Sequence, residues 1–179
     1  AVGDINELGA GYAADGYARY KGIGAVSVQF GVGTFSVLNA IAGAYVERNP
    51  VVVITASPTT DNRKLIQETG VLFHHSTGKL TADRNVFSNV TVAAEILNDP
   101  AHAPHMIDHA LTQAISHKRP IYLEAWQDVW GENCHKPKGT LESIKVESQA
   151  ASLASLIENA LVKLNKANNP VVLLGIEIQ

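Results

Sequence analysis

The sequence predicts an α/β fold, a parallel sheet with helices on both faces, and three observations support this. Short apolar runs alternate with stretches that carry apolar residues at helical spacing. Residues 51–54 (VVVI) form a continuous apolar run, which is typical of a central parallel strand buried on both faces. A strand, a tight turn and a helix precede that run, so residues 25–54 are predicted to form a βαβ unit.

The first element is a helix expected over residues 7–20, with Asn6 placed to cap its first turn. Three glycines interrupt it, and each costs about 1 kcal/mol relative to alanine inside a helix. These are Gly9, Gly11 and Gly16. They indicate that another backbone or a ligand approaches closely, so we expect this helix to be buried.

The βαβ unit comes next. We expect a strand over residues 25–30, a tight turn over 31–34 and a helix over 35–46. Pro50 ends the helical pattern, and the strand at 51–54 completes the unit.

Residues 57–86 are polar and show no helical period, so we expect a long loop of the kind that is usually functional or disordered. Beyond it we expect a short strand over 90–93 and a helix over 104–117. The apolar residues at 121–123 predict a further buried strand.

The composition changes after residue 130. Residues 1–130 are expected to form one domain, and the polar stretch 131–150 a linker. Residues 151–179 are expected to begin a second α/β domain, with a helix over 151–166 and a buried strand starting at 171–174. Because a strand needs neighbours for its backbone hydrogen bonds, we expect the chain to be truncated within this second domain.

The composition also excludes several classes of protein. The 14 Lys and Arg residues against 17 Asp and Glu give a net charge of −3, which excludes binding to a polyanion such as nucleic acid through bulk charge. Charged residues make up 17%, against about 25% in a typical globular domain, so we expect an oligomer or a fragment whose surface is partly covered. The single cysteine, Cys134, excludes an intrachain disulfide and a Cys-rich metal site. Without an apolar run of about 18 residues or a signal peptide, we expect a soluble, cytoplasmic protein that does not enter a membrane.

Two motifs are better explained by structure than by chemistry. The turn formed by Gly31, Val32 and Gly33 could cradle a phosphate at a helix N-terminus, but its spacing matches neither the dinucleotide fingerprint nor the P-loop. A tight turn is the better interpretation. The second motif is a set of three histidines at helical spacing, opposite the apolar stripe of their helix, which is typical of a solvated face rather than a metal site. They are His102, His105 and His109.

Two other features can carry chemistry. His74 and His75 place two groups of near-neutral pKa together in the long loop, where they either act on a ligand or simply meet water. Glu7 opens the glycine-rich helix, where a carboxylate complements the helix dipole. If Glu7 is buried, it can instead exchange a proton near neutral pH.

Four ordered stretches resemble one known family, the thiamine diphosphate (ThDP)-dependent 2-oxo acid decarboxylases, which include pyruvate, indolepyruvate and phenylpyruvate decarboxylases. The stretches are NELGAGYAADGYARYKG at 6–22, FGVGTFSVLNAIAGAYVERNPVVVI at 30–54, FHHSTG at 73–78 and RPIYLEAWQDV at 119–129. The resemblance covers nearly all of residues 4–130, which match the pyrimidine-binding domain. The histidine pair is the most specific feature, because the related acetolactate synthases lack it.

The resemblance implies roles for particular residues. The glutamate that matches Glu7 hydrogen-bonds the aminopyrimidine ring of ThDP and favours its imino tautomer, which prepares the cofactor to attack the substrate. His74 and His75 match the pair that binds the substrate and relays protons. Gln29, Gly31, Val32 and Gly33 are implied to border the cofactor, although Gln29 stands where relatives often carry a threonine.

The resemblance also implies what lies outside these residues. In the family, a strand and a helix with an active-site aspartate precede the glutamate motif. The diphosphate and Mg²⁺ are held by a C-terminal domain of the neighbouring subunit, so we expect a homodimer or homotetramer with shared active sites. We therefore expect the 179 residues alone to be inactive and to contain no metal ligands.

The leading prediction is the non-oxidative decarboxylation of a 2-oxo acid to an aldehyde and carbon dioxide. One alternative is a carboligating ThDP enzyme of the acetolactate synthase type. Another is an α/β domain that serves only as a subunit interface.

Overall fold

A computed structural model describes residues 1–137, 139–141 and 149–178. The chain divides into two compact units, Ala1–Ser143 and Ile144–Gln179. The predicted linker at 131–150 lies partly outside the described residues, and the predicted limits of the two domains stay predictions.

The first unit contains a four-stranded sheet in which all strands are parallel, in the order β1-β2-β4-β3. The strands are β1 (Gly24–Val28), β2 (Val51–Ser57), β3 (Ala94–Leu97) and β4 (Ile121–Trp126). Among the described residues of this unit, the helices are α1 (Glu7–Lys21), α2 (Val32–Val46), α3 (Thr60–Thr69), α4 (Ala82–Phe87) and α5 (Ala103–His117). The predicted parallel α/β fold is therefore confirmed.

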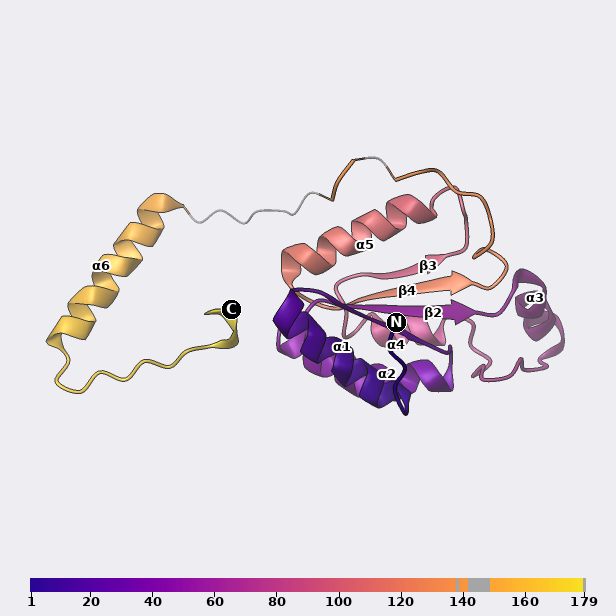
Figure 1. The fold of residues 1–179 in the computed structure, drawn as a ribbon, viewed down its shortest axis with the longest axis horizontal. Coiled ribbons are helices and arrows are strands. Elements are labelled where there is room, and N and C mark those ends of the chain that lie inside the picture. The colour runs from indigo at the N-terminus through magenta and orange to yellow at the C-terminus, as the bar shows by residue number, and fades with distance from the viewer. Residues whose placement is uncertain (138, 142–148, 179) are drawn as a thin grey trace. The chain divides into compact units, whose positions relative to one another are not determined.

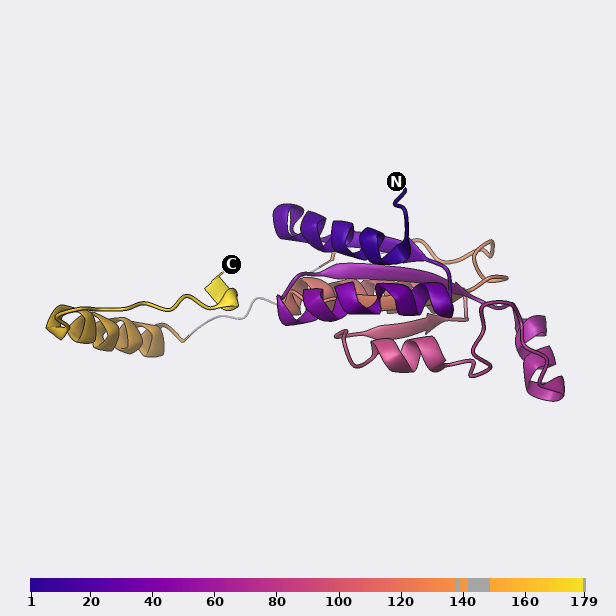
Figure 2. The same ribbon diagram turned by 90° about the horizontal axis from the view of Figure 1, so that it is seen from below.

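Helices cover both faces of the sheet (Figures 1 and 2). On one face, α1, α2 and Phe87 of α4 pack around a core that includes Val53 and Tyr122. On the other face, α5 packs through Ala110 and Ala114 against Val52 and Leu123. The side chains of β2 alternate between the two faces, which explains why its run is apolar throughout.

Helix α1 begins where the sequence predicts. The Asn6 side chain accepts a hydrogen bond from the Gly9 amide at 2.8 Å. Gly11 packs so closely on Val37 and Ala40 of α2 that a Cβ there would overlap both side chains. The expectation of a buried helix was wrong, because α1 buries only one side and its outer side exposes Tyr12, Tyr17 and Tyr20.

The predicted loop at 57–86 was also wrong, because it contains two helices, α3 and α4. Helix α3 buries only Ile66 and the polar Arg63, and therefore gives no apolar stripe that periodicity can detect. It is nevertheless capped at both ends. The Thr59 hydroxyl accepts from the Asn62 amide, and Gly70 ends the helix at φ 71°.

Other boundaries also differ from the prediction: β1 ends at Val28 rather than residue 30, β2 continues to Ser57 rather than residue 54, and β4 continues to Trp126 rather than residue 123. Helix α2 starts at Val32 inside the predicted turn, and β3 lies at Ala94–Leu97, after the predicted 90–93. In the second unit, α6 (Ala150–Lys166) is formed as predicted, and a short 3₁₀ turn, η1, covers Ile176–Ile178. Residues 171–174 are exposed coil rather than a strand, since among the described residues of this unit no strand is present to pair with them.

None of the described helices is both long and apolar enough to cross a membrane. In the described part of the chain, no cluster of three or more His, Cys, Asp and Glu side chains is placed to hold a metal ion.

Candidate functional site

Four segments meet at the carboxyl edge of the sheet. They are the start of α2, the carboxyl ends of β2 and β4, and the loop between α3 and α4. In Figure 1, α3 lies beyond the ends of the strands, and the loop returns from it to α4. This edge is where open parallel sheets bind their ligands.

Glu7, the first residue of α1, is half-buried and lies against the first turn of α2. A Cβ added to Gly33 would stand only 3.3 Å from Glu7 Oε1. No side chain caps α2, and the free N–H groups at a helix start favour a nearby negative charge. Gln29 approaches the same position, with its Cβ 3.1 Å from the added atom, while its side chain is exposed.

The turn before α2 requires a glycine at Gly31. Its φ of 69° and ψ of −120° lie in a region that other residues rarely adopt. The backbone carbonyl of His75 occupies the space that a side chain at Gly31 would need. The loop that carries the histidines therefore packs directly on the turn that precedes α2.

The two histidines are exposed, and their rings cluster with two phenylalanine rings. The ring centroids of His74 and His75 are 4.9 Å apart, and Phe73 lies 4.3 Å from His74. The buried Phe30 lies 5.9 Å from His74 and 6.4 Å from His75. The aromatic packing on Phe30, which directly precedes Gly31, holds the imidazoles beside the same turn.

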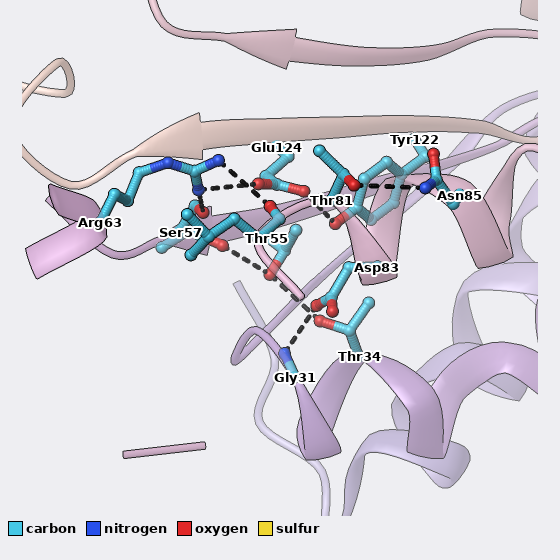
Figure 3. Close-up of polar contacts among 12 residues, drawn as sticks. Gly31, Thr34, Thr55, Ser57, Arg63, Thr81, Asp83, Asn85, Tyr122 and Glu124 are labelled. Atoms are coloured by element: carbon cyan, nitrogen blue, oxygen red, sulfur yellow. Dashed lines mark hydrogen bonds and ion pairs between the residues drawn. The ribbon is translucent and has the colours of Figure 1, made fainter. Parts of the chain in front are cut away.

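Next to this turn lies a buried polar network (Figure 3). The Arg63 guanidinium donates to Ser57 Oγ at 2.7 Å and to the carbonyl of Leu80 at 3.1 Å, and its Nη1 is 3.8 Å from Glu124 Oε1. The Tyr122 hydroxyl donates to Glu124 Oε2 at 3.1 Å. Arg63 also stacks over the Trp126 ring at 4.4 Å, so the network joins α3, β2 and β4.

Burial dominates the titration of this network. It raises the pKa of Glu124 above its ordinary value, and the negative charge of Asp83 adds to this. Hydrogen bonds from Ser57 and Tyr122 and the charge of Arg63 oppose the rise in the Glu124 pKa. The pKa of Arg63 is lowered by burial, while the charges of Glu124 and Asp128 oppose that change.

Asp83 connects α4 to the start of α2. Its Oδ2 accepts a hydrogen bond from the Gly31 amide at 2.6 Å, as Figure 3 shows. A further pair of buried hydroxyls, Thr34 of α2 and Thr55 of β2, lies 3.2 Å apart behind this bond. The first contact ties the start of α2 to α4, and the second ties it to β2.

The structure thus gathers the predicted site residues around one helix start. Glu7 and Gln29 approach Gly33, while the backbone carbonyl of His75 contacts Gly31. Val32, between them, is 57% exposed. His102, which is the N-cap of α5, and His105 and His109 within α5 lie on an exposed face, which confirms the prediction of a solvated surface.

Sequence reasoning did not find Arg63, Asp83 or Glu124. One signal was available, since Glu124 is a carboxylate inside the apolar run of β4 and a buried carboxylate requires a cationic or hydrogen-bonding partner.

The fold and this arrangement define a cofactor-binding α/β domain. Residues 1–87 match the family model described as "Thiamine pyrophosphate enzyme, N-terminal TPP binding domain". The chain belongs to this family of ThDP enzymes, which confirms the resemblance seen in the sequence.

Its relatives include named decarboxylases. The chain is 35% identical over 175 residues to an indole-3-pyruvate decarboxylase of Azospirillum brasilense, covering 97% of this chain and 31% of the relative. It is 38% identical over 184 residues to pyruvate decarboxylase 1 of Zea mays, covering 99% of this chain and 29% of the relative. It is 48% identical over 124 residues to a pyruvate decarboxylase of Aspergillus parasiticus, covering 68% of this chain and 21% of the relative. The chain thus spans about three tenths of the length of the first two relatives.

The residues at the start of α2 fit the aminopyrimidine of ThDP. A half-buried carboxylate stands beside the uncapped helix start, and Gly33 keeps the space next to it free of a side chain. The exposed Val32 offers an apolar surface to a flat ring. A larger residue at Gly33 would crowd Glu7.

Proposed function

We propose that this chain is the pyrimidine-binding part of an enzyme that decarboxylates a 2-oxo acid to an aldehyde and carbon dioxide without oxidation. The single observation that carries this proposal is that Glu7 and the loop of His74 and His75 contact the same helix start. The names of the relatives support pyruvate or an aromatic 2-oxo acid as the substrate.

Each of these residues has a distinct role in the proposed reaction. Glu7 holds a proton at the ring nitrogen of the aminopyrimidine, and Gly33 leaves room for that contact. Gln29 and Val32 border the cofactor, with the exposed Gln29 amide able both to donate and to accept. His74 and His75 bind the substrate and move protons to and from it, for which imidazoles are well suited near neutral pH. When bound, ThDP supplies the nucleophilic carbon and the electron sink for the decarboxylation.

The rest of the active site is proposed to come from outside these residues. We propose that another domain, contributed by a neighbouring subunit of a homodimer or homotetramer, holds the diphosphate and Mg²⁺. The exposed tyrosines of α1 provide a surface for such a neighbour. We also propose a cytoplasmic location.

The test replaces Glu7 by glutamine in the full-length protein. The amide keeps the size of the side chain but cannot exchange the proton, so kcat should fall about 10²- to 10⁴-fold. Glu68→Gln is the matched control, because Glu68 is an exposed carboxylate on α3, and this variant should keep its turnover. Thermal unfolding of both variants checks that the fold is intact. An unchanged kcat in Glu7→Gln would refute the proposal and favour a domain that serves only as an interface.

Product analysis separates the carboligating alternative. With pyruvate, phenylpyruvate or indolepyruvate as substrate, decarboxylation releases one aldehyde for each carbon dioxide. A carboligase of the acetolactate synthase type instead joins two pyruvate molecules with loss of one carbon dioxide. Release of acetolactate without acetaldehyde would assign the chain to that alternative.

A further inference from the structure

We propose that Asp83 is a positioning residue that holds the loop of His74 and His75 against the start of α2. This inference rests on the proposed function, because it concerns how the histidines reach the site that Glu7 borders. Asp83 itself touches no reacting group. It acts through the backbone of Gly31 and through the loop segment that precedes α4.

The geometry of the turn carries the argument. The Gly31 amide donates to Asp83 Oδ2 at 2.6 Å, and the His75 carbonyl fills the space above the Gly31 Cα. The loop therefore contacts Gly31 through the His75 carbonyl, while the Gly31 N–H bonds Asp83 of α4, the helix that follows the loop. If the bond to Asp83 is lost, the turn and the loop are free to separate.

The loop itself has few other anchors. Near the histidines, the backbone hydrogen bonds stay within the loop, from the Ser76 amide to the Phe73 carbonyl at 3.1 Å and from the Gly78 amide to Ser76 Oγ at 3.1 Å. Both histidine side chains are exposed. Their position relative to Glu7 therefore depends on the packing against Phe30 and on the attachment of the ends of the loop.

Arg63 attaches the segment just before α4. Its guanidinium donates to the carbonyl of Leu80 while Ser57 and Glu124 hold it in place. Arg63 thus fixes Leu80 to the sheet, and Asp83, three residues later, fixes the same segment to α2. Asp83 joins that segment to the turn that the histidine loop touches, which makes it the residue to test.

The charge of Asp83 is part of this link. A carboxylate that accepts from a backbone amide makes a bond roughly twice as strong as a neutral pair, and the start of α2 favours negative charge. Asn at this position keeps an acceptor oxygen without the charge, and Ala removes the acceptor. The loss of kcat should therefore be larger in Asp83→Ala than in Asp83→Asn.

The experiment compares Asp83→Asn and Asp83→Ala with Asn85→Ala in the full-length protein. Asn85 is an exposed residue of the same helix, and its side chain donates to the Thr81 hydroxyl four residues earlier. We expect kcat to fall about 10-fold for Asn and about 100-fold for Ala, because a displacement of about 1 Å can cost 10²-fold. The dissociation constant of ThDP should change less than about twofold, since the contact of Glu7 with Gly33 is untouched. Asn85→Ala should match the parent protein in kcat and in the dissociation constant of ThDP.

A second measurement needs neither cofactor nor activity. Hydrogen exchange of the full-length protein without ThDP should be faster in residues 71–81 of both Asp83 variants, while β2 keeps its protection. If Asp83→Ala does not fold, Asp83→Asn decides the question by the same two measurements.

Unchanged kcat in both Asp83 variants would overturn the inference, and so would unchanged exchange in the loop. A loss of ThDP affinity that equals the loss of kcat would also overturn it, since Asp83 would then act on cofactor binding. Failure of the proposed function is distinguished by another variant, because it would appear as full activity of Glu7→Gln. In that case the exchange experiment would still test whether Asp83 holds the loop.

Discussion

Replacing Gly31 by alanine tests whether the histidine loop and the helix start form one unit. The φ of 69° and ψ of −120° at this residue cost a side chain of the L configuration about 1–3 kcal/mol in backbone strain. The added Cβ would also overlap the carbonyl oxygen of His75. Because ordinary contacts of a carbon atom lie at about 3.5–4.0 Å, the loop must withdraw by more than about 1 Å.

That displacement sets the expected loss of activity. A movement of about 1 Å in a positioned catalytic group can cost 10²-fold, so kcat of Gly31→Ala should fall by about that factor. Gly70→Ala is the matched control, because Gly70 also has a positive φ, 71°, but an added Cβ there meets nothing within 4 Å. The control should lose about 1–2 kcal/mol of stability and keep its kcat.

Steady-state kinetics and urea unfolding of both variants provide the comparison in the full-length protein. If Gly31→Ala is destabilised but turns over as fast as Gly70→Ala, the loop position does not control the reaction. The contact between the loop and α2 would then be a feature of stability alone.

Two further predictions concern the buried residues behind the site. Burial raises the pKa of Glu124 in the folded protein above the value of about 4.5 in the unfolded chain. The stability that Glu124 contributes is therefore complete below about pH 4.5, and it is lost as the pH rises through the pKa of the folded state. Urea titrations from pH 4 upward should therefore show the parent protein losing stability relative to Glu124→Gln, and a pH-independent difference would contradict this. Phe87 is fully buried and stacks on Tyr122 at 4.8 Å, so Phe87→Ala should cost about 3–5 kcal/mol in the free energy of unfolding. The neighbouring Ser88 is exposed, so Ser88→Ala should lower the free energy of unfolding by less than about 1 kcal/mol. Equal losses of stability in the two variants would disprove the packing argument.

Strands β2 and β4 could be predicted from sequence because burial on both faces leaves a local signal. The apolar run of β2 and that of β4 are each visible without knowledge of any partner. The glycine argument succeeded at Gly11, which touches α2, and failed at Gly16, where an added Cβ meets nothing within 4 Å. A glycine thus permits a close approach without proving that one occurs.

The helices around the histidine loop left no such signal. Helix α3 turns a buried arginine toward the sheet, and α4 has only six residues, so neither shows an apolar period. The partners that stabilise them are distant in sequence. Asp83 and Gly31 are separated by 52 positions, and Thr60 bonds Asp128 across 68.

The polar network nevertheless follows from a rule that combines sequence with topology. In the register of the sheet, Thr55 lies beside Glu124 and Ser57 beside Trp126, so the polar residues that end β2 and β4 fall at one edge. A carboxylate there is buried by the neighbouring strand and needs a cationic partner, which the first helix after β2 supplies as Arg63. Knowing that β2 and β4 are neighbours would therefore have located the network, although neither strand indicates that pairing by itself. Glu7 and the histidines are proposed from their motifs, whereas Arg63, Asp83 and Glu124 belong to no motif that the sequence shows by itself.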